Sequence, residues 1–136
     1  MDVIIKHLLG LAFNHGIGVV ETRSLTSHTP SFAVPKKKTI ILNMNWYNER
    51  ELPLVLAHEI AHIFKDTETA TTTSTTHIKC EGAADAYAIS LLVQYYYEYI
   101  LESEITLLNI ENFMTMFAVP SCERWKVVKV FEDRFK

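Results

Sequence analysis

The sequence predicts an α+β fold in which one helix precedes a small three-stranded sheet and helices make up most of the remainder. Short apolar runs of strand length gather between residues 17 and 43, whereas residues 2–15 and most of the chain beyond residue 48 place apolar residues at helical spacing. The chain has 136 residues, of which 49% are hydrophobic, with only four Gly and four Pro. This is enough to bury one core. We therefore expect a single domain over residues 1–136 with a helical tail from about residue 103.

Charge and composition narrow the classes of partner. The net charge is −3 and the pI about 6.0, so the chain has no global attraction to nucleic acid. No apolar run approaches the roughly 20 residues that cross a bilayer, and the start lacks the zones of a secretory signal. We expect a cytoplasmic protein with no membrane partner, in which Cys80 and Cys122 are free thiols.

The first elements follow from apolar spacing and from turn residues. The apolar positions of residues 2–15 recur at helical spacing, and Gly16 provides a stop. Residues 17–21, 31–34 and 39–43 are predicted strands. The three lysines between the last two strands are interpreted as a solvated hairpin turn rather than as a phosphate site.

A helix is predicted to begin just before residue 54. Asn48 followed by Glu51 forms a capping pattern, and Pro53 suits a first turn. The apolar residues that follow, up to Phe64, imply a helix buried on most of its faces.

The second half of the chain begins with a predicted loop. Residues 67–76 are rich in threonine and have no helical period, whereas residues 81–93 are alanine-rich and helical. The tyrosines at 95–97 and 99 are expected to wrap the core rather than to form a partner surface. The last two helices are predicted at 105–117 and at 123–135, with Ser121 as the N-cap of the latter.

The central motif is the sequence His-Glu-Ile-Ala-His at residues 58–62. Two histidines four apart lie on one face of a helix and can share a metal, while Glu59 lies beside it. Neutral imidazoles suit Zn²⁺, and a neighbouring carboxylate can take a proton from water. The alternative is a buried, hydrogen-bonded pair of histidines without metal.

A catalytic zinc site needs a third protein ligand. Glu68 stands six residues after His62, as in the metzincin arrangement, but Lys65 replaces the glycine that this bend requires. His77 with Cys80 would instead complete a closed structural site, which has no use for the glutamate of the motif.

Glu81 is the best candidate for the third ligand. It opens the alanine-rich helix, and Asp85 lies one turn later on the same face. Glu81 can then bind the metal while Asp85 accepts the second N–H of a ligating histidine and fixes its tautomer. The remaining alternative is a helix with two solvated acids.

These two motifs resemble the ImmA/IrrE family of metallopeptidases, whose pattern is H-E-x-x-H followed by E-x-x-A-[DN]-x-[FY]-A. The second element reads Glu-Gly-Ala-Ala-Asp-Ala-Tyr-Ala at residues 81–88. The resemblance spans roughly residues 1–95 and implies Zn²⁺ on His58, His62 and Glu81, with Glu59 as catalytic base. It also implies a minimal thermolysin-like zincin fold, in which the helix pair binds the zinc.

The resemblance further implies a zinc-dependent endopeptidase whose substrate is the transcriptional repressor of a phage or mobile element. The chain departs from the family pattern after residue 92, where Val93, Gln94 and the tyrosines follow. The tail is similar to the helix-turn-helix-like tail of such proteins, but its few bases predict no DNA binding.

Two other functions remain open from the sequence. A zincin-fold anti-repressor would bind its repressor without cutting it, and a zinc-stabilised module would unfold on chelation. For the protease, the strand at residues 40–45 is the expected edge on which a substrate strand adds. His77, Tyr87 and the tyrosine cluster are the candidates for stabilising the oxyanion.

Overall fold

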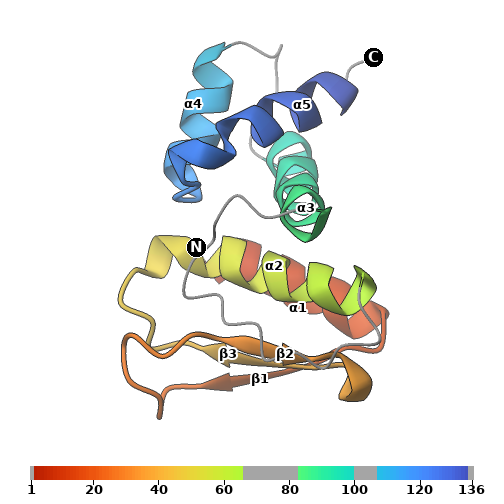
Figure 1. The fold of residues 1–136 in the computed structure, drawn as a ribbon, viewed down its shortest axis with the longest axis vertical. Coiled ribbons are helices and arrows are strands. Elements are labelled where there is room, and N and C mark those ends of the chain that lie inside the picture. Colours follow the sequence, from red (N-terminus) through yellow and green to blue (C-terminus); the bar gives the residue numbers. More distant parts are fainter. Residues whose placement is uncertain (1, 66–82, 100–106, 135–136) are drawn as a thin grey trace.

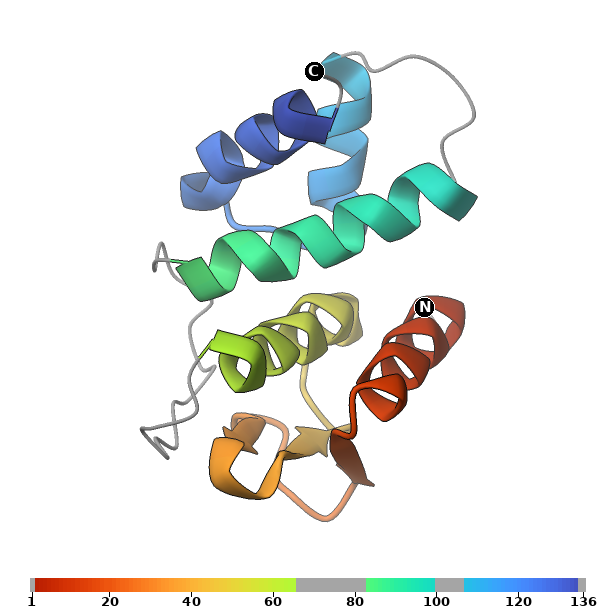
Figure 2. The same cartoon turned by 90° about the vertical axis from the view of Figure 1, so that its right-hand side faces the viewer.

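The computed structural model describes residues 2–65, 83–99 and 107–134, and in them the predicted α+β architecture is confirmed. Helices α1 and α2 lie side by side on one face of a three-stranded sheet (Figure 1). Helix α3 crosses over both of them, and α4 and α5 form a further layer beyond it (Figure 2). None of the described helices is long and apolar enough to span a bilayer.

Helix α1 (Asp2–Asn14) ends where the sequence predicts. Gly16 adopts a φ of +75°, which a residue without a Cβ reaches at no steric cost. Its N–H bonds to the carbonyl of Phe13, and the N–H of Ile17 bonds to that of Ala12 at 2.9 Å. These two bonds form a Schellman motif, which turns the chain directly into the first strand.

The sheet contains β1 (Gly18–Thr22), β2 (Phe32–Val34) and β3 (Thr39–Asn43), close to the three predicted strands. The order is β1-β3-β2, with β1 parallel and β2 antiparallel to β3. The predicted hairpin turn is confirmed as a 3₁₀ turn, Pro35–Lys37, that ends with Lys38 in the left-handed region. The prediction that residues 40–45 form a sheet edge is wrong, because β3 pairs on both sides and is the central strand.

Asn43, at the end of β3, holds the long connection between β1 and β2. Its side-chain N–H groups donate to the carbonyls of Thr26 at 2.8 Å and Thr29 at 2.7 Å, and its backbone N–H donates to the Ser31 hydroxyl. Asn43 is fully buried, so these bonds satisfy a polar group that would otherwise be costly to bury.

Helix α2 (Leu52–Lys65) begins after a 3₁₀ turn, Glu49–Glu51. The predicted cap is confirmed, since the Asn48 side chain accepts a bond from the backbone N–H of Arg50. Glu51 differs from a capping box, because its carboxylate accepts from the Trp46 indole N–H at 2.8 Å and from the Asn48 amide. The entry into α2 is therefore tied to the loop that follows β3.

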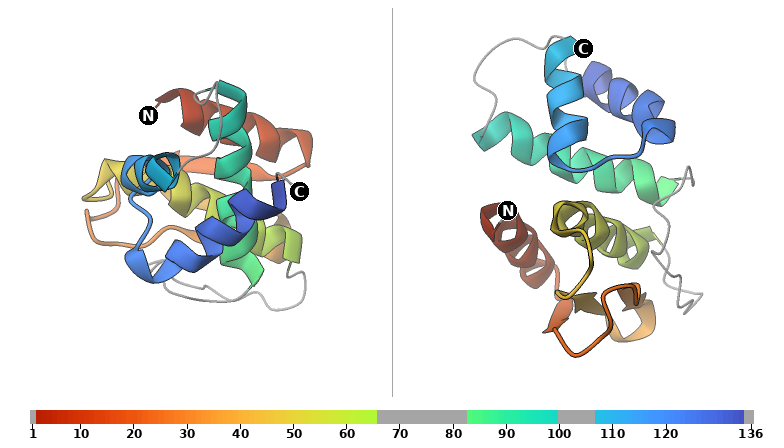
Figure 3. Two further views of the ribbon diagram at one scale, coloured as in Figure 1. Left: turned by 90° about the horizontal axis from the view of Figure 1, so that it is seen from above. Right: turned by 90° about the vertical axis from the view of Figure 1, so that its left-hand side faces the viewer.

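Helix α3 (Ala83–Tyr99) lies between the sheet-containing N-terminal part and the last two helices. It packs on α2 on one side and on α5 on the other (Figure 3). Tyr95 and Tyr96 are buried, which confirms that this part of the tyrosine cluster wraps the core. Beyond α3, helix α4 (Leu107–Met116) contributes Phe113, whose ring centroid lies 5.5 Å from those of Tyr96 and Phe131. These edge-to-face contacts form an aromatic core away from the sheet.

The last helix, α5 (Arg124–Arg134), follows a 3₁₀ turn, Ser121–Glu123. The prediction of Ser121 as N-cap is wrong: Pro120 occupies the cap, and Ser121 is already inside the turn. Lys126 is buried and lies 3.0 Å from the buried carboxylate of Glu123. This pairing removes one of the few tail bases from any nucleic-acid surface.

Candidate metal centre

Helix α2 brings the two histidines of the central motif together. The Nε2 atoms of His58 and His62 lie 2.9 Å apart, and the two rings are perpendicular with centroids 4.4 Å apart. This arrangement follows from the helical spacing of four residues, which stacks the side chains one turn apart. Both rings therefore direct the same nitrogen toward a shared point.

The separation of the two nitrogens fits a shared zinc ion with little adjustment. Two Zn–N bonds of about 2.0–2.1 Å at a tetrahedral angle hold their nitrogens about 3.3 Å apart. The observed 2.9 Å is a few tenths of an ångström shorter, a difference that small side-chain rotations absorb. In a metal-free chain, the same geometry serves as an N–H···N hydrogen bond between a donor and an acceptor imidazole.

The side chains of the motif become more exposed toward the C-terminal end of α2. His58 is 1% exposed and Glu59 0% exposed, whereas His62 is half-buried. A carboxylate and an imidazole in the interior of α2 are costly unless they are satisfied, so their presence there is not explained by packing alone. The site is closed at His58 and accessible at His62.

The described residues contain only part of the predicted ligand set. Asp85 lies in the first turn of α3, the helix that packs along α2, as the two-helix arrangement requires. Glu81, the predicted third ligand, lies outside the described residues, as do the alternatives Glu68, His77 and Cys80. Within the described residues no group of three or more metal-ligating side chains is found.

An aromatic contact fixes α3 against the end of α2. The ring of Phe64 lies edge-on to Tyr87 with centroids 5.5 Å apart, and His15 packs on Phe64 at 4.9 Å. We call His15, Phe64 and Tyr87 the aromatic bridge. It joins the turn after α1 to α2 and α3, two residues away from His62 and from Asp85. The sequence analysis missed the roles of Phe64 and His15, because no local spacing reveals a contact between three segments that are separate in the sequence.

The positions of the tyrosines along α3 reduce the number of candidates for the oxyanion-stabilising residue. Tyr95 and Tyr96 lie in the second half of α3, where Tyr95 packs on His7 and Tyr96 on Phe113. Tyr87 is half-buried and lies near the C-terminal end of α2. Tyr97 packs on Phe131, so Tyr87 is the candidate of α3 with a ring contact to α2, and His77 lies outside the described residues.

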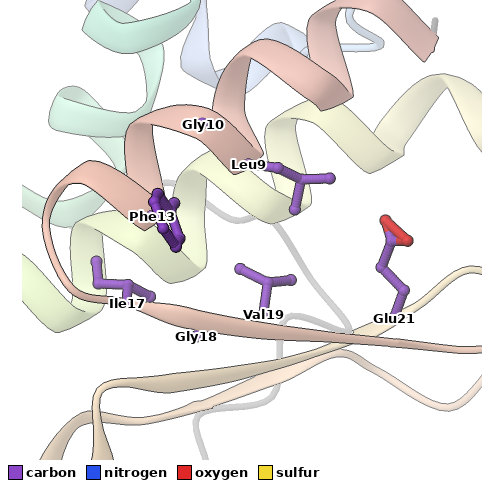
Figure 4. A pocket seen from close by; sticks show the side chains of 7 residues that line it. All are labelled: Leu9, Gly10, Phe13, Ile17, Gly18, Val19 and Glu21. Carbon is purple, nitrogen blue, oxygen red and sulfur yellow. The ribbon is translucent and has the colours of Figure 1, made fainter.

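A groove of about 620 Å³ lies apart from these histidines, between α1 and β1 (Figure 4). It is lined by Leu9, Gly10, Phe13, Ile17, Gly18, Val19 and Glu21. None of these residues belongs to α2 or α3, so this groove is separate from the candidate metal site.

Three comparisons bear on family membership. No family model matches the chain, and neither a curated protein nor a solved structure matches it. The candidate site is therefore supported by the chemistry of its own residues and by the two motifs.

Proposed function

We propose that this protein is a zinc-dependent endopeptidase with a minimal thermolysin-like zincin fold, as in the ImmA/IrrE family. The observation that carries the proposal is the helical motif of residues 58–62, with two Nε2 atoms 2.9 Å apart and a fully buried glutamate next to the first histidine. Together with the sequence pattern, these two features favour a metal-binding pair over a purely hydrogen-bonded pair of histidines.

In this proposal, some residues bind the zinc and others take part in peptide hydrolysis. His58, His62 and Glu81 would hold Zn²⁺, and Asp85 would orient one histidine by accepting its second N–H. When bound, the zinc supplies a Lewis acid that polarises a peptide carbonyl and acidifies water. Glu59 accepts the proton of the attacking water and returns it to the leaving amine, while Tyr87 is the candidate donor to the developing oxyanion.

The sheet offers a place for the substrate at β2. This strand is antiparallel to β3, lies at one edge of the described sheet, and packs against α2. An extended substrate segment added beside residues 32–34 pairs through its backbone and runs along the helix that carries the histidines. This corrects the predicted edge at residues 40–45 and keeps the same mode of binding.

The proposed substrate is a transcriptional repressor, as the family resemblance implies. The fold agrees with recognition of an extended protein segment, because the edge strand selects backbone rather than a particular side chain. The rival function, an anti-repressor that binds without cutting, uses the same edge and differs only in whether Glu59 acts.

The first experiment measures zinc per chain by elemental analysis after identical purification. We expect about one zinc in wild type, and loss of zinc in His62→Ala and in Glu81→Ala. His28→Gln is the matched control, since His28 stacks on Tyr47 in another loop. Zinc retained in Glu81→Ala rejects Glu81 as an essential ligand, and a wild type without zinc rejects the proposed metal centre.

The second experiment tests proteolysis with a purified transcriptional repressor of a phage or mobile element, the substrate class that the family resemblance implies. Incubation with the zinc-loaded protein should yield defined fragments, and Glu59→Gln should abolish them while still binding zinc. If Glu59→Gln relieves repression as well as wild type does, binding alone is the function. Undiminished cleavage by this variant rejects Glu59 as the base.

A further inference from the structure

The groove between α1 and β1 has the form of a binding surface rather than of a packing defect. Its walls are apolar side chains from both elements, Leu9 and Phe13 above and Ile17 and Val19 below, with Glu21 at one end (Figure 4). Phe13 is 80% exposed, so most of a large apolar side chain is in contact with water, which is unfavourable. An exposed apolar surface next to a hollow is typical of an interaction site.

The lower wall of the groove is also an unpaired sheet edge. β1 pairs with β3 on one side, and no strand lies on its other side among the described residues. The outward groups of a strand edge pair best with another extended chain. Val20, on the face opposite the groove, is 50% exposed, so an added strand would cover apolar surface on both faces.

Gly10 in the groove has no explanation within the chain. It lies in the middle of α1, where glycine disfavours the helix relative to alanine. A Cβ at this position would meet nothing within 4 Å, so the fold itself does not require a glycine there. The close approach of another chain does explain why this position has no side chain.

The charges determine what this other chain contains. Glu21 is exposed and makes no ion pair with the described residues, and it is the one charged residue that lines the groove. An apolar groove with an acid at one end complements an extended segment that has apolar side chains at every second position. Such a segment would also place a lysine or arginine opposite Glu21.

We propose that the α1–β1 groove binds an extended segment of a partner protein by strand addition to β1. The segment places an apolar side chain over Gly10 and against Phe13, and a basic side chain opposite Glu21. A second copy of this chain fits less well. Antiparallel pairing of two β1 strands brings the Glu21 of one copy over the apolar groove of the other, and no base lines that groove.

The test selects ligands from a phage-displayed library of short random peptides on the immobilised wild-type chain. Enriched peptides are synthesised with a fluorophore, and their dissociation constants are measured by anisotropy. The variants are Phe13→Asp, Gly10→Leu and Glu21→Lys. Trp125→Asp is the matched control, because Trp125 is 61% exposed on α5. Circular dichroism verifies that each variant is folded.

We expect enriched peptides with alternating apolar residues and a basic residue near one end. Phe13→Asp and Gly10→Leu should each weaken binding about tenfold or more, and Trp125→Asp should not. A repeated selection on Glu21→Lys should replace the basic residue by an acidic one. The proposal is overturned by a library without enrichment or by ligands indifferent to these three variants. It is also overturned by a wild-type dimer in sedimentation that Phe13→Asp dissociates, since the occupant is then a second copy.

Discussion

Helix α2 and the C-terminal pair α4 and α5 both contribute side chains to the core, but they bury different chemical groups. At the centre of α2 a histidine and a glutamate are almost fully enclosed. Between α3, α4 and α5 aromatic rings are prominent in the core, and the enclosed charges of Glu123 and Lys126 form an ion pair at 3.0 Å. Hydrophobic burial is the dominant stabilising term in folding, and enclosed ionisable groups oppose it. A chain that places such groups in its most enclosed helix gives up stability there, and we infer that the aromatic half compensates.

This comparison predicts opposite outcomes for substitutions in the two regions. Changes in the aromatic half should alter the free energy of unfolding and leave zinc binding intact. Changes at the central motif should alter zinc binding, cleavage or both, with little loss of stability of the metal-free protein.

The largest effect on stability is expected for Phe113→Ala. Phe113 is fully buried and contacts the rings of Tyr96, Phe117 and Phe131. Removing its ring should lower the free energy of unfolding by about 3–5 kcal/mol, as measured by urea denaturation. The zinc content per folded chain should not change. A loss of zinc in the folded fraction would show that the two regions are coupled rather than separate.

The next effect concerns the buried ion pair of Glu123 and Lys126 in the aromatic half. Glu123→Gln leaves the buried ammonium of Lys126 without its charged partner, so we expect a loss of about 3 kcal/mol. The double variant Glu123→Gln with Lys126→Met should recover most of it, because no charge then remains buried. Equal stabilities of Glu123→Gln and the double variant in urea would mean that Lys126 costs no more than a methionine at this position once Glu123 is neutral, which would contradict the prediction.

At the central motif, Glu59→Gln should separate stability from function. The amide keeps the shape of the carboxylate and removes a charge from a fully buried position. We expect the free energy of unfolding of the metal-free protein to stay within about 1 kcal/mol of wild type, and cleavage to fall about 100-fold or more. Chemical denaturation in the presence of a chelator, paired with the cleavage assay, measures both. A strongly destabilised variant would make Glu59 a structural residue.

The elements of the fold were largely predictable because local signals define them. Gly16 stops the first helix, Asn48 caps the second, and the three strands lie within one or two residues of their apolar runs. The order of the strands was not predictable in this way. Consecutive apolar runs indicate strands but not which strand is central, and the parallel pairing of β1 with β3 depends on a long connection held by Asn43.

The candidate site also has a part that the sequence predicted and contacts that it did not. The placement of His58, Glu59 and His62 follows from helical spacing, so the sequence was sufficient for them. The aromatic bridge and the buried pair of Glu123 and Lys126 involve contacts whose partners the sequence analysis did not associate. The sequence analysis counted Lys126 only among the few bases of the tail, and the packing of α5 on α3 shows that it is buried.

The smallest prediction compares how the two regions end a helix. In the N-terminal half Gly16 takes the left-handed position after α1, and in the C-terminal half Ala118 takes it after α4 with a φ of +51°. Both turns have the same pair of hydrogen bonds, the second through Val119 to the carbonyl of Met114 at 2.9 Å. Since alanine is strained at this φ and glycine is not, Ala118→Gly should raise the free energy of unfolding by about 0.5–1 kcal/mol, and Gly16→Ala should lower it by about 1 kcal/mol. A Cβ on Gly16 meets nothing within 4 Å, so the second change tests backbone strain without a steric clash. Thermal unfolding of both variants measures these two changes in stability. A destabilised Ala118→Gly would mean that the conformational entropy that glycine adds to the unfolded chain outweighs the strain that it relieves in the folded one.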